Sequence, residues 1–473
     1  MSKSINASDY ASVMARKGEI MKNAIGIDYS VFESGSIAFD YERMMKETGY
    51  TMEEMRKIQG AVHVGNTPII ELPNITALAR KCAKPGYGAR IFIKDEAANP
   101  SGSFKDRRAS IAAYHAKKLG FKGILTATSG NYGAAVASQA AMHGLKCIVV
   151  QECYDSSGKG QPEIIEKARK CEALGAEVVQ LSVGPELFYK FLLLLEETGY
   201  FNASLYTPFG IAGVETLGFE IAEQFRAKFG KDPDLVVATN AGGGNLTGTA
   251  RGLLKAGSKT PVIGASVSLA GLHMASDSHF NKKSFTTGHT GFGIPFSSWP
   301  DRSDVPRSGA RPLRYMDRYV TIPQGVVFYM TEALASLEGQ EKGPAGNTSL
   351  AAAFAIAQEL PEDQLLLVQE TEYTGAGKHI QPQLSFAKSN GIEILIGNPK
   401  DEVPGKNLIL PESPTMIKTT EIDLDHVRSS LIKTAMKTFN SNPTEADIAF
   451  LCEETRKTPE FVKRVIEKVK SEG

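Results

Sequence analysis

Short runs of apolar residues alternate with amphipathic stretches from about residue 89 onward. The apolar runs, each predicted to be a strand, are residues 89–94, 123–128, 146–151, 176–181, 234–239, 261–266 and 364–369. The stretches between them that are predicted to be helices include residues 104–119, 131–143, 161–174 and 214–229. Continuous apolar strands are typical of a parallel sheet buried on both faces. Their alternation with helices therefore predicts an α/β protein.

The pattern differs at the two ends of the chain and in one internal segment. Residues 1–60 are predicted to be mainly helical, with Thr51 as a helix cap. Residues 276–314 are rich in Gly, Ser, Pro and Arg, which predicts a long loop. The tail is predicted to contain two helices, over residues 424–438 and 444–470.

Composition and charge narrow the classes of protein. The 53 basic and 53 acidic residues give a formal net charge of zero, which argues against a nucleic-acid binder or a polybasic membrane protein. The five cysteines include no CxxC pair, so neither a disulfide framework nor a zinc site is expected. The first residues lack the apolar run of a signal peptide, and no run of about 18 apolar residues occurs. We expect a cytoplasmic protein.

The strongest local motif is the segment 99–107, NPSGSFKDR, between a predicted strand and a predicted helix. Its Pro-Ser-Gly part is typical of a tight turn, and Ser103 is expected to cap the helix. Lys105 then falls in the first helical turn, where the positive end of the helix dipole lowers the pKa of an amine. A lysine that forms a Schiff base needs such a neutral amine. Taken alone, the motif fits a surface lysine on a capped helix equally well.

The second motif consists of Thr128, Ser129, Gly130 and Asn131, between another strand and helix. Backbone N–H groups at a helix start and two hydroxyls suit a carboxylate ligand. The Asn131 amide can donate a hydrogen bond to a phenolic oxygen. Alone, the segment is more typical of a strand–helix turn that binds no ligand.

The third motif consists of Gly242, Gly243, Gly244 and Asn245. It follows a predicted strand and precedes a helix, so its backbone can fold around a phosphate and the helix dipole adds attraction. A dinucleotide fingerprint does not fit, because the third glycine of GxGxxG would fall at Thr247 and no acid closes the strand at 261–266. No Gly-Lys-Ser/Thr follows, which excludes a Walker loop.

The fourth motif, residues 372–378 (EYTGAGK), follows the last predicted strand. A hydroxyl at Thr374 is suited to face a ring nitrogen, although the segment alone is typical of an ordinary loop. All four motifs lie just beyond predicted strands, where α/β folds bind ligands. We therefore expect one ligand site that combines the Lys105 amine, a carboxylate-binding turn, a phosphate-binding glycine loop and the Thr374 hydroxyl.

Together, these motifs resemble the fold type II pyridoxal 5′-phosphate (PLP) enzymes, the group of threonine synthase, serine/threonine dehydratases and the tryptophan synthase β-subunit. The resemblance covers roughly residues 60–400 and extends to Gly65-Asn66-Thr67-Pro68 and to residues 213–216 and 344–346. It implies an α/β fold with two lobes, each with a mainly parallel sheet flanked by helices. The domains it implies are an N-terminal helical segment (1–60), a large cofactor-binding domain (61–105 and 214–400), a small α/β domain (106–213) and a C-terminal helical extension (401–473).

The resemblance also implies a role for each motif. Lys105 is the catalytic lysine to which PLP is covalently bound, and Asn131 contacts the cofactor O3′. Residues implied to hold the substrate carboxylate are Thr128, Ser129, Gly130 and Asn131. Residues implied to bind the cofactor phosphate are Gly242, Gly243, Gly244 and Asn245. Thr374 faces the pyridine nitrogen, and a neutral hydroxyl there leaves this nitrogen unprotonated, which suits chemistry at the β-carbon.

Over its whole length, including the N-terminal helices and the C-terminal tail, the chain is similar to the β-subunits of 2-amino-4-ketopentanoate thiolases, which act in ornithine degradation. This resemblance implies a reaction of 2-amino-4-ketopentanoate with coenzyme A (CoA) that gives acetyl-CoA and alanine. It implies a small α-subunit as partner and a dimer of β-subunits within a hetero-oligomer. Nucleic acid, membrane and metal are not expected as partners.

Two alternatives remain open. A threonine synthase-like or cysteate synthase-like enzyme would catalyse a β- or γ-replacement, but it needs a phosphate pocket for its substrate that the sequence does not indicate. Arg108 also stands where many threonine synthases have glycine, which is a departure from that group. A non-catalytic PLP-binding regulatory subunit is the other alternative, and the presence of Lys105 with every other predicted cofactor contact argues against it.

Several residues have no assigned role. Arg302, Arg307, Arg311 and Arg314 lie in the segment 276–314 and fit either contacts to CoA phosphates or a solvated arginine-bearing loop. Lys378 and His379 fit proton transfer or an ordinary loop. Cys153 fits a nucleophile or a small buried apolar residue, and the second is the more common.

Overall fold

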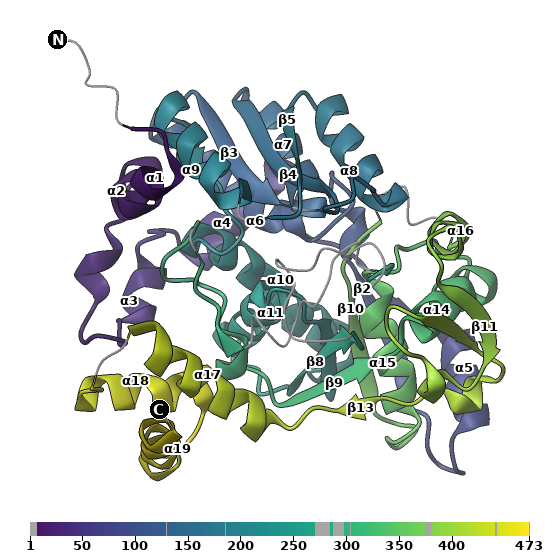
Figure 1. Cartoon of the computed structure of the whole chain (residues 1–473). Helices are drawn as coiled ribbons and strands as arrows, with labels where there is room; N and C mark the ends of the chain where they lie inside the picture. The colour runs from purple at the N-terminus through teal and green to yellow at the C-terminus, as the bar shows by residue number, and fades with distance from the viewer. Residues whose placement is uncertain are drawn as a thin grey trace.

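Two β-sheets with helices packed on their faces make up most of the computed structural model (Figure 1). The structure describes residues 7–128, 130–184, 186–269, 284–286, 298–302, 304–373, 380–439 and 442–472. Each apolar run of the sequence overlaps one strand of these sheets, namely β2, β3, β4, β5, β7, β8 and β10 in Figure 1. The prediction of an α/β fold is therefore confirmed.

The larger sheet contains seven strands among the described residues, in the order β1-β2-β10-β7-β8-β9-β13. The strands are β1 Ile69–Glu71, β2 Arg90–Asp95, β7 Leu235–Thr239, β8 Val262–Val267, β9 Arg318–Ile322, β10 Leu365–Glu370 and β13 Thr420–Glu421. The five central strands run parallel, whereas β1 and β13 pair antiparallel at the two edges. All residues of β8 and β10 are buried, as expected for strands covered on both faces.

Helices cover both faces of the larger sheet. They are α5 Pro73–Cys82, α10 Pro208–Phe229, α11 Gly244–Lys255, α14 Gln324–Glu338 and α15 Asn347–Ala357. On one face, Leu217 of α10 and Leu246 of α11 belong to the same apolar cluster as Phe92 of β2. On the other face, α5, α14 and α15 pack in a cluster with Ile91 and Val368. Every residue of α15 is buried, so this Ala-rich helix forms part of the core.

The smaller sheet is parallel and has the strand order β5-β4-β3-β6. Its strands and helices are β3 Gly123–Thr128, β4 Lys146–Tyr154, β5 Glu177–Ser182, β6 Phe201–Asn202, α6 Lys105–Lys118, α7 Asn131–His143, α8 Pro162–Ala173 and α9 Glu186–Thr198. Leu125 of β3 packs with Phe191 of α9 on one face. Its neighbour Ile124 packs with Ala135 of α7 on the other face, since successive strand residues point to opposite sides.

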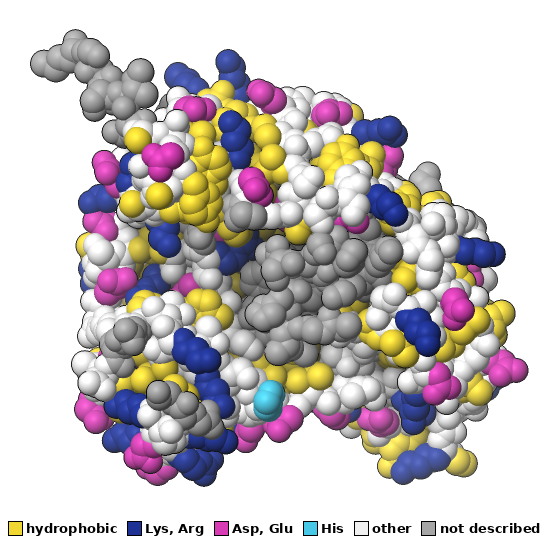
Figure 2. Space-filling view, in the orientation of Figure 1, with side chains coloured by type: hydrophobic (Ala, Val, Ile, Leu, Met, Phe, Trp, Pro, Cys, Tyr) yellow, Lys and Arg dark blue, Asp and Glu magenta, His cyan; other side chains and the backbone are white. Residues whose placement is uncertain are grey.

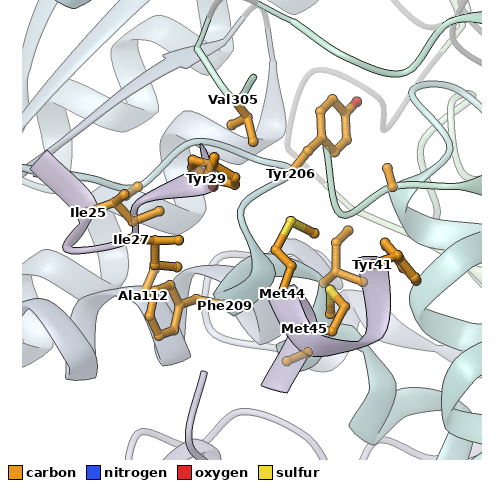
Figure 3. Packing of buried hydrophobic residues seen from close by; sticks show 14 of the residues in the cluster. Ile25, Ile27, Tyr29, Tyr41, Met44, Met45, Ala112, Tyr206, Phe209 and Val305 are labelled. Carbon is orange, nitrogen blue, oxygen red and sulfur yellow. The ribbon is translucent and has the colours of Figure 1, made fainter. Parts of the chain in front are cut away.

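The N-terminal segment packs against helices of both sheet systems. Its helices are α1 Tyr10–Ala15, α2 Lys17–Ile25, α3 Tyr41–Lys46 and α4 Met52–Gly60. Figure 3 shows Ile27 and Tyr29 of this segment in one cluster with Ala112 of α6 and Phe209 of α10. The predicted Thr51 cap is confirmed, because the Thr51 side chain accepts a hydrogen bond from Glu54 N in a capping box.

The C-terminal part adds a two-stranded parallel sheet and a group of helices. Its elements are α16 Gln381–Ser389, β11 Glu393–Gly397, β12 Asn407–Pro411, α17 Leu424–Phe439, α18 Glu445–Thr455 and α19 Pro459–Glu472. The prediction of one helix over 444–470 was wrong. Arg456 lies between α18 and α19 with a left-handed φ of 52°, which ends the first helix. The helix expected over 214–229 also begins earlier, at Pro208, where the Thr207 side chain accepts from Gly210 N.

The surface shows no concentration of one charge on the face seen in Figure 2, where basic and acidic side chains are interspersed. Within the described ranges, none of the helices has the length and apolar character needed to cross a membrane. The domain boundaries given above stay a prediction.

Candidate active site

Four loops meet at the carboxyl ends of strands from both sheets. Because β2, β10 and β7 are adjacent and parallel, the loops that follow them leave the same edge of the larger sheet. Phe104 N donates to Thr371 O over 3.0 Å, and Tyr373 N donates to Gly102 O over 2.7 Å. Asn131, which follows β3 of the smaller sheet, donates from Nδ2 to Glu372 Oε2 over 3.3 Å. The motifs around Lys105, Asn131 and Glu372 therefore lie together.

A tight turn places Lys105 at the first position of α6. Gly102 N donates to Asn99 O over 2.8 Å, and Gly102 has a left-handed φ of 79°. A Cβ at Gly102 would lie 2.2 Å from Tyr373 O, so the close approach of the two loops requires glycine there. The Asp106 carboxylate accepts from Ser101 N over 2.7 Å and closes the turn from the helix side.

The expectation that Ser103 caps this helix was wrong. The helix cap is Phe104, which has helical backbone angles and makes no side-chain cap hydrogen bond. The Ser103 hydroxyl is buried without a hydrogen-bond partner. Since Phe104 already continues the helical conformation, Ser103 is one residue too early for its side chain to cap the first turn.

Lys105 is half-buried, and its amine lies 4.7 Å from the centre of the Phe104 ring. Burial lowers its pKa to about 7, the positive charge of Arg108 acts in the same direction, and the carboxylate of Glu372 opposes both. Much of this amine is therefore neutral near pH 7, which is the form that attacks an aldehyde.

The segment after β3 begins α7 directly. Gly130 is the cap position of α7, and its N donates to Thr128 Oγ over 3.1 Å. Asn131 is 5% exposed, and its Oδ1 is buried without a hydrogen-bond partner. A buried amide oxygen that lacks a partner is uncommon, so this end of Asn131 is suited to a ligand group. Ser129 lies outside the described residues.

The glycines after β7 form the start of α11. Gly243 caps this helix with a left-handed φ of 82°. A Cβ on Gly242 would lie 1.5 Å from the Tyr206 hydroxyl, and one on Gly244 would lie 2.7 Å from Arg108 Nη2. The loop therefore admits no side chains, and the first amides of α11 are left for an anion. The Asn245 side chain is engaged elsewhere, because it donates to Thr239 O and accepts from Gln369, so only its backbone N–H is suited to that anion.

The end of β10 brings two carboxyl groups that the sequence analysis did not single out. Both carboxyl oxygens of Glu370 are buried without a hydrogen-bond partner. Burial raises the pKa of Glu370 well above its usual value, and the neighbouring Glu372 adds to this effect. Burial therefore favours the neutral form of Glu370 near the site. The only sequence signal was the pair of acids at the end of an apolar strand. Thr374, Lys378 and His379 lie outside the described residues.

The four arginines of the long segment contact carboxylates. Their pairs are Arg302 with Asp304, Arg307 with Glu33, Arg311 with Asp301, and Arg314 with Glu454. The interpretation as a solvated loop is wrong for the described part of this segment, since these side chains are 13% exposed or less. With their charges already neutralised, we do not assign them to CoA.

Cys153 is confirmed as a buried apolar residue. It is fully buried in a small cluster with Ile164 and Ala168, and burial raises the pKa of its thiol to about 12. A thiol with that pKa is a poor nucleophile. In the part of the chain that the structure describes, no group of three or more His, Cys, Asp or Glu side chains is placed to hold a metal ion.

The groups at this site fit PLP. The neutral amine of Lys105 suits its aldehyde, the side-chain-free amides at the start of α11 suit its phosphate, and the buried side chain of Asn131 adds a polar amide. The family model for "pyridoxal-phosphate dependent enzyme" matches residues 61–370, which include Lys105, Asn131 and the glycine loop Gly242–Gly244. The chain belongs to the family of pyridoxal-phosphate-dependent enzymes.

Individual relatives are similar over almost the whole chain. The identity is 73% over 462 residues, 98% of each chain, to the 2-amino-4-ketopentanoate thiolase beta subunit of Acetoanaerobium sticklandii. It is 65% over 459 residues, 97% of each chain, to a protein of the same name from an unknown prokaryotic organism. Among solved structures, O-ureido-L-serine synthase matches with a TM-score of 0.52 and 24% identity, over 67% of this chain and 92% of that one. This last match supports the fold.

Proposed function

We propose that the chain is the PLP-bearing β-subunit of a thiolase that converts 2-amino-4-ketopentanoate and CoA into acetyl-CoA and alanine, a step of ornithine degradation. The observation that carries the proposal is the 73% identity to a thiolase beta subunit across 98% of both chains. That similarity includes the N-terminal helices and the C-terminal extension, which lie outside the family match at residues 61–370.

We propose the following contacts for the cofactor and the substrate. Lys105 carries PLP, Asn131 contacts its O3′, and Thr374 faces its ring nitrogen. The phosphate lies on the amides of Gly242, Gly243, Gly244 and Asn245. The substrate carboxylate lies on Thr128, Ser129, Gly130 and Asn131. The convergence of the loops after β2, β3 and β10 and the neutral amine of Lys105 support these assignments.

When bound, PLP withdraws electrons from the α-carbon of the attached amino acid. The Lys105 amine would hold the cofactor and, when free, would accept the α-proton at Nζ and later return it, because a pKa of about 7 lets it exchange protons near neutral pH. In the overall reaction the CoA sulfur forms a bond to C4 of the substrate and the C3–C4 bond breaks. The electron pair stays on C3, which takes up a proton and becomes the methyl group of alanine.

We propose a small α-subunit as the partner, with a dimer of this chain inside the hetero-oligomer. The name "beta subunit" that both relatives carry supports a second type of subunit.

Product analysis tests the function. The chain, purified together with its co-expressed α-subunit, is incubated with CoA and 2-amino-4-ketopentanoate labelled with 13C at C4 and C5. We expect labelled acetyl-CoA and unlabelled alanine in equal amounts by mass spectrometry, and neither product with Lys105→Ala. Absence of acetyl-CoA would contradict the proposal. Turnover of O-phosphohomoserine or O-phosphoserine instead would identify a β- or γ-replacement enzyme.

A further inference from the structure

We propose that Arg108 is a phosphate-binding residue, which holds the phosphate of bound PLP together with the glycine loop Gly242–Gly244. This inference rests on the cofactor contacts proposed above. The sequence motifs predict a phosphate site made of backbone amides alone. Arg108 would add a positively charged side chain from α6 to that site.

Arg108 is a buried cation without an acidic partner. Its side chain belongs to a residue that is 3% exposed, and Nε has no hydrogen-bond partner. Among the described residues it forms no ion pair, and its hydrogen bond from Nη1 to Leu205 O is long at 3.5 Å. Burial lowers the pKa of Arg108, and the groups that oppose this effect are the phenols of Tyr206 and Tyr132 rather than carboxylates. Burying an unpaired charge is costly, so this guanidinium is suited to pair with an anionic ligand.

The neighbouring arginine, Arg107, is also buried, but its guanidinium is paired with carboxylates. Arg107 is fully buried, and its guanidinium contacts the carboxylates of Glu96 and Glu220 at 2.7 and 2.8 Å. The network also includes Lys94, which lies 3.1 Å from Glu220. Arg107 and Arg108 are adjacent on α6, but only Arg107 is paired with carboxylates of the described residues. This contrast indicates that Arg108 has a different role.

The Arg108 guanidinium points at the glycine loop. Its Nη2 lies 2.7 Å from the position of a Cβ on Gly244, which is the first residue of α11. The group is held between the rings of Phe104 and Tyr206, with its central carbon 5.0 and 5.7 Å from their centres. Because residues three apart share a helix face, Arg108 and Lys105 project to the same side of α6. The cation therefore lies between the amine that binds PLP and the loop that receives a phosphate.

Phosphate is the ligand whose chemistry fits these groups. A guanidinium presents paired N–H donors that match two oxygens of a phosphate, and the amides at the start of α11 supply further donors. CoA also carries phosphates. The position of Arg108 at the loop proposed for the cofactor favours PLP, and the two sources are separated by experiment.

The test compares PLP with pyridoxal, which lacks the phosphate. The full chain is freed of cofactor, and the dissociation constants of both ligands are measured for wild type, Arg108→Gln and Arg108→Lys. We expect Arg108→Gln to weaken PLP binding by about 10- to 100-fold and to leave pyridoxal binding unchanged. The PLP affinity of Arg108→Lys should lie between those of wild type and Arg108→Gln, because lysine keeps the charge but lacks the paired donors. The 31P resonance of bound PLP should also shift in Arg108→Gln.

Arg307→Gln is the matched control. Arg307 is another buried arginine, but it already contacts Glu33 and Ile37 O, so its loss should not change the ratio of PLP to pyridoxal affinity. Equal loss of both ligands in Arg108→Gln, or no loss of either, would overturn the proposal. So would weaker binding of CoA relative to dephospho-CoA with an unchanged PLP to pyridoxal ratio. If circular dichroism shows that Arg108→Gln does not fold, the ratio of PLP to pyridoxal affinity in Arg108→Lys decides. If the cofactor assignment itself is wrong, borohydride treatment of wild type will leave no PLP attached to Lys105.

Discussion

The amine of Lys105 is the residue on which the proposed chemistry depends. Its position in the first turn of α6 could be predicted from the strand–turn–helix pattern, and so could the direction of its pKa shift. The helix dipole was the expected cause of that shift. In the structure the main cause is burial, followed by the charge of Arg108. Burial was not readable from the sequence, because it depends on which residues of other loops surround the amine, whereas Arg108 stands three positions further along the same helix.

The lowered pKa of Lys105 leads to a testable pH dependence. A lysine with a pKa of about 7 is protonated below that pH and neutral above it. The rate at which PLP attaches to the cofactor-free chain should therefore rise with pH up to about 7 and then level off. Stopped-flow absorbance measures this rate. A rate that continues to rise toward pH 10 would show that the amine keeps the usual lysine pKa.

Other residues of the site show where sequence reasoning ends. The motifs predicted Asn131 and the three glycines as site residues, because turns and helix starts have local sequence signatures. Glu370 and Arg108 have no such signature. The surroundings of both groups depend on residues far away in the chain: Asp95 and Lys342 act on the pKa of Glu370, and Gly244 lies beside the Arg108 guanidinium.

At the scale of elements, seven apolar strands were predictable, including the edge strand β5, whereas the central strand β9 and the strands of two or three residues were not. The buried strand β10 reads as a continuous apolar run, LLLV, and its position was predicted to within a residue. The strands β1, β6 and β13 contain two or three residues each, too few to give a pattern. The strand β11 is partly exposed, and its pairing with β12 joins segments that propensity alone does not connect.

The start of α11 gives a prediction at this scale. Gly243 has a φ of 82°, and a Cβ there would lie 2.6 Å from Pro312. Gly243→Ala should therefore cost more than the roughly 1–2 kcal/mol expected for a left-handed alanine, and it should weaken PLP binding by displacing the loop. Urea unfolding and PLP titration measure the two effects.

Gly230→Ala is the matched control for this variant. Gly230 ends α10 with a φ of 68°, and a Cβ there would meet no atom within 4 Å. It should lose about 1–2 kcal/mol of stability and keep the affinity for PLP. Equal behaviour of the two variants would mean that Pro312 does not constrain the glycine loop.

At the scale of the whole molecule, the C-terminal helices hold the segment that packs on the glycine loop. Glu454 of α18 contacts Arg311 and Arg314. Arg311 N donates to Thr247 Oγ over 3.0 Å, and Thr247 in turn donates to Gly243 O. The tail could be predicted as helical from its sequence, but this connection could not, since the paired residues lie about 140 positions apart.

Two adjacent glutamates test this connection. Glu454 is 2% exposed and contacts two arginines, so Glu454→Gln should lower the free energy of unfolding by about 3–5 kcal/mol. Glu453 is 68% exposed and contacts Arg314 alone among the described residues, so Glu453→Gln should cost less than about 1 kcal/mol. Urea denaturation of both variants gives the comparison. Similar values would contradict the buried network.

The most direct test of the central claim is to locate the cofactor in the purified chain. Borohydride makes the bond between PLP and its lysine permanent, and peptide mass mapping then identifies the modified residue. We predict that the label lies on Lys105, in the peptide around residues 99–107, and that Lys105→Ala carries none. A label on another lysine, or wild-type protein without any label, would contradict the account.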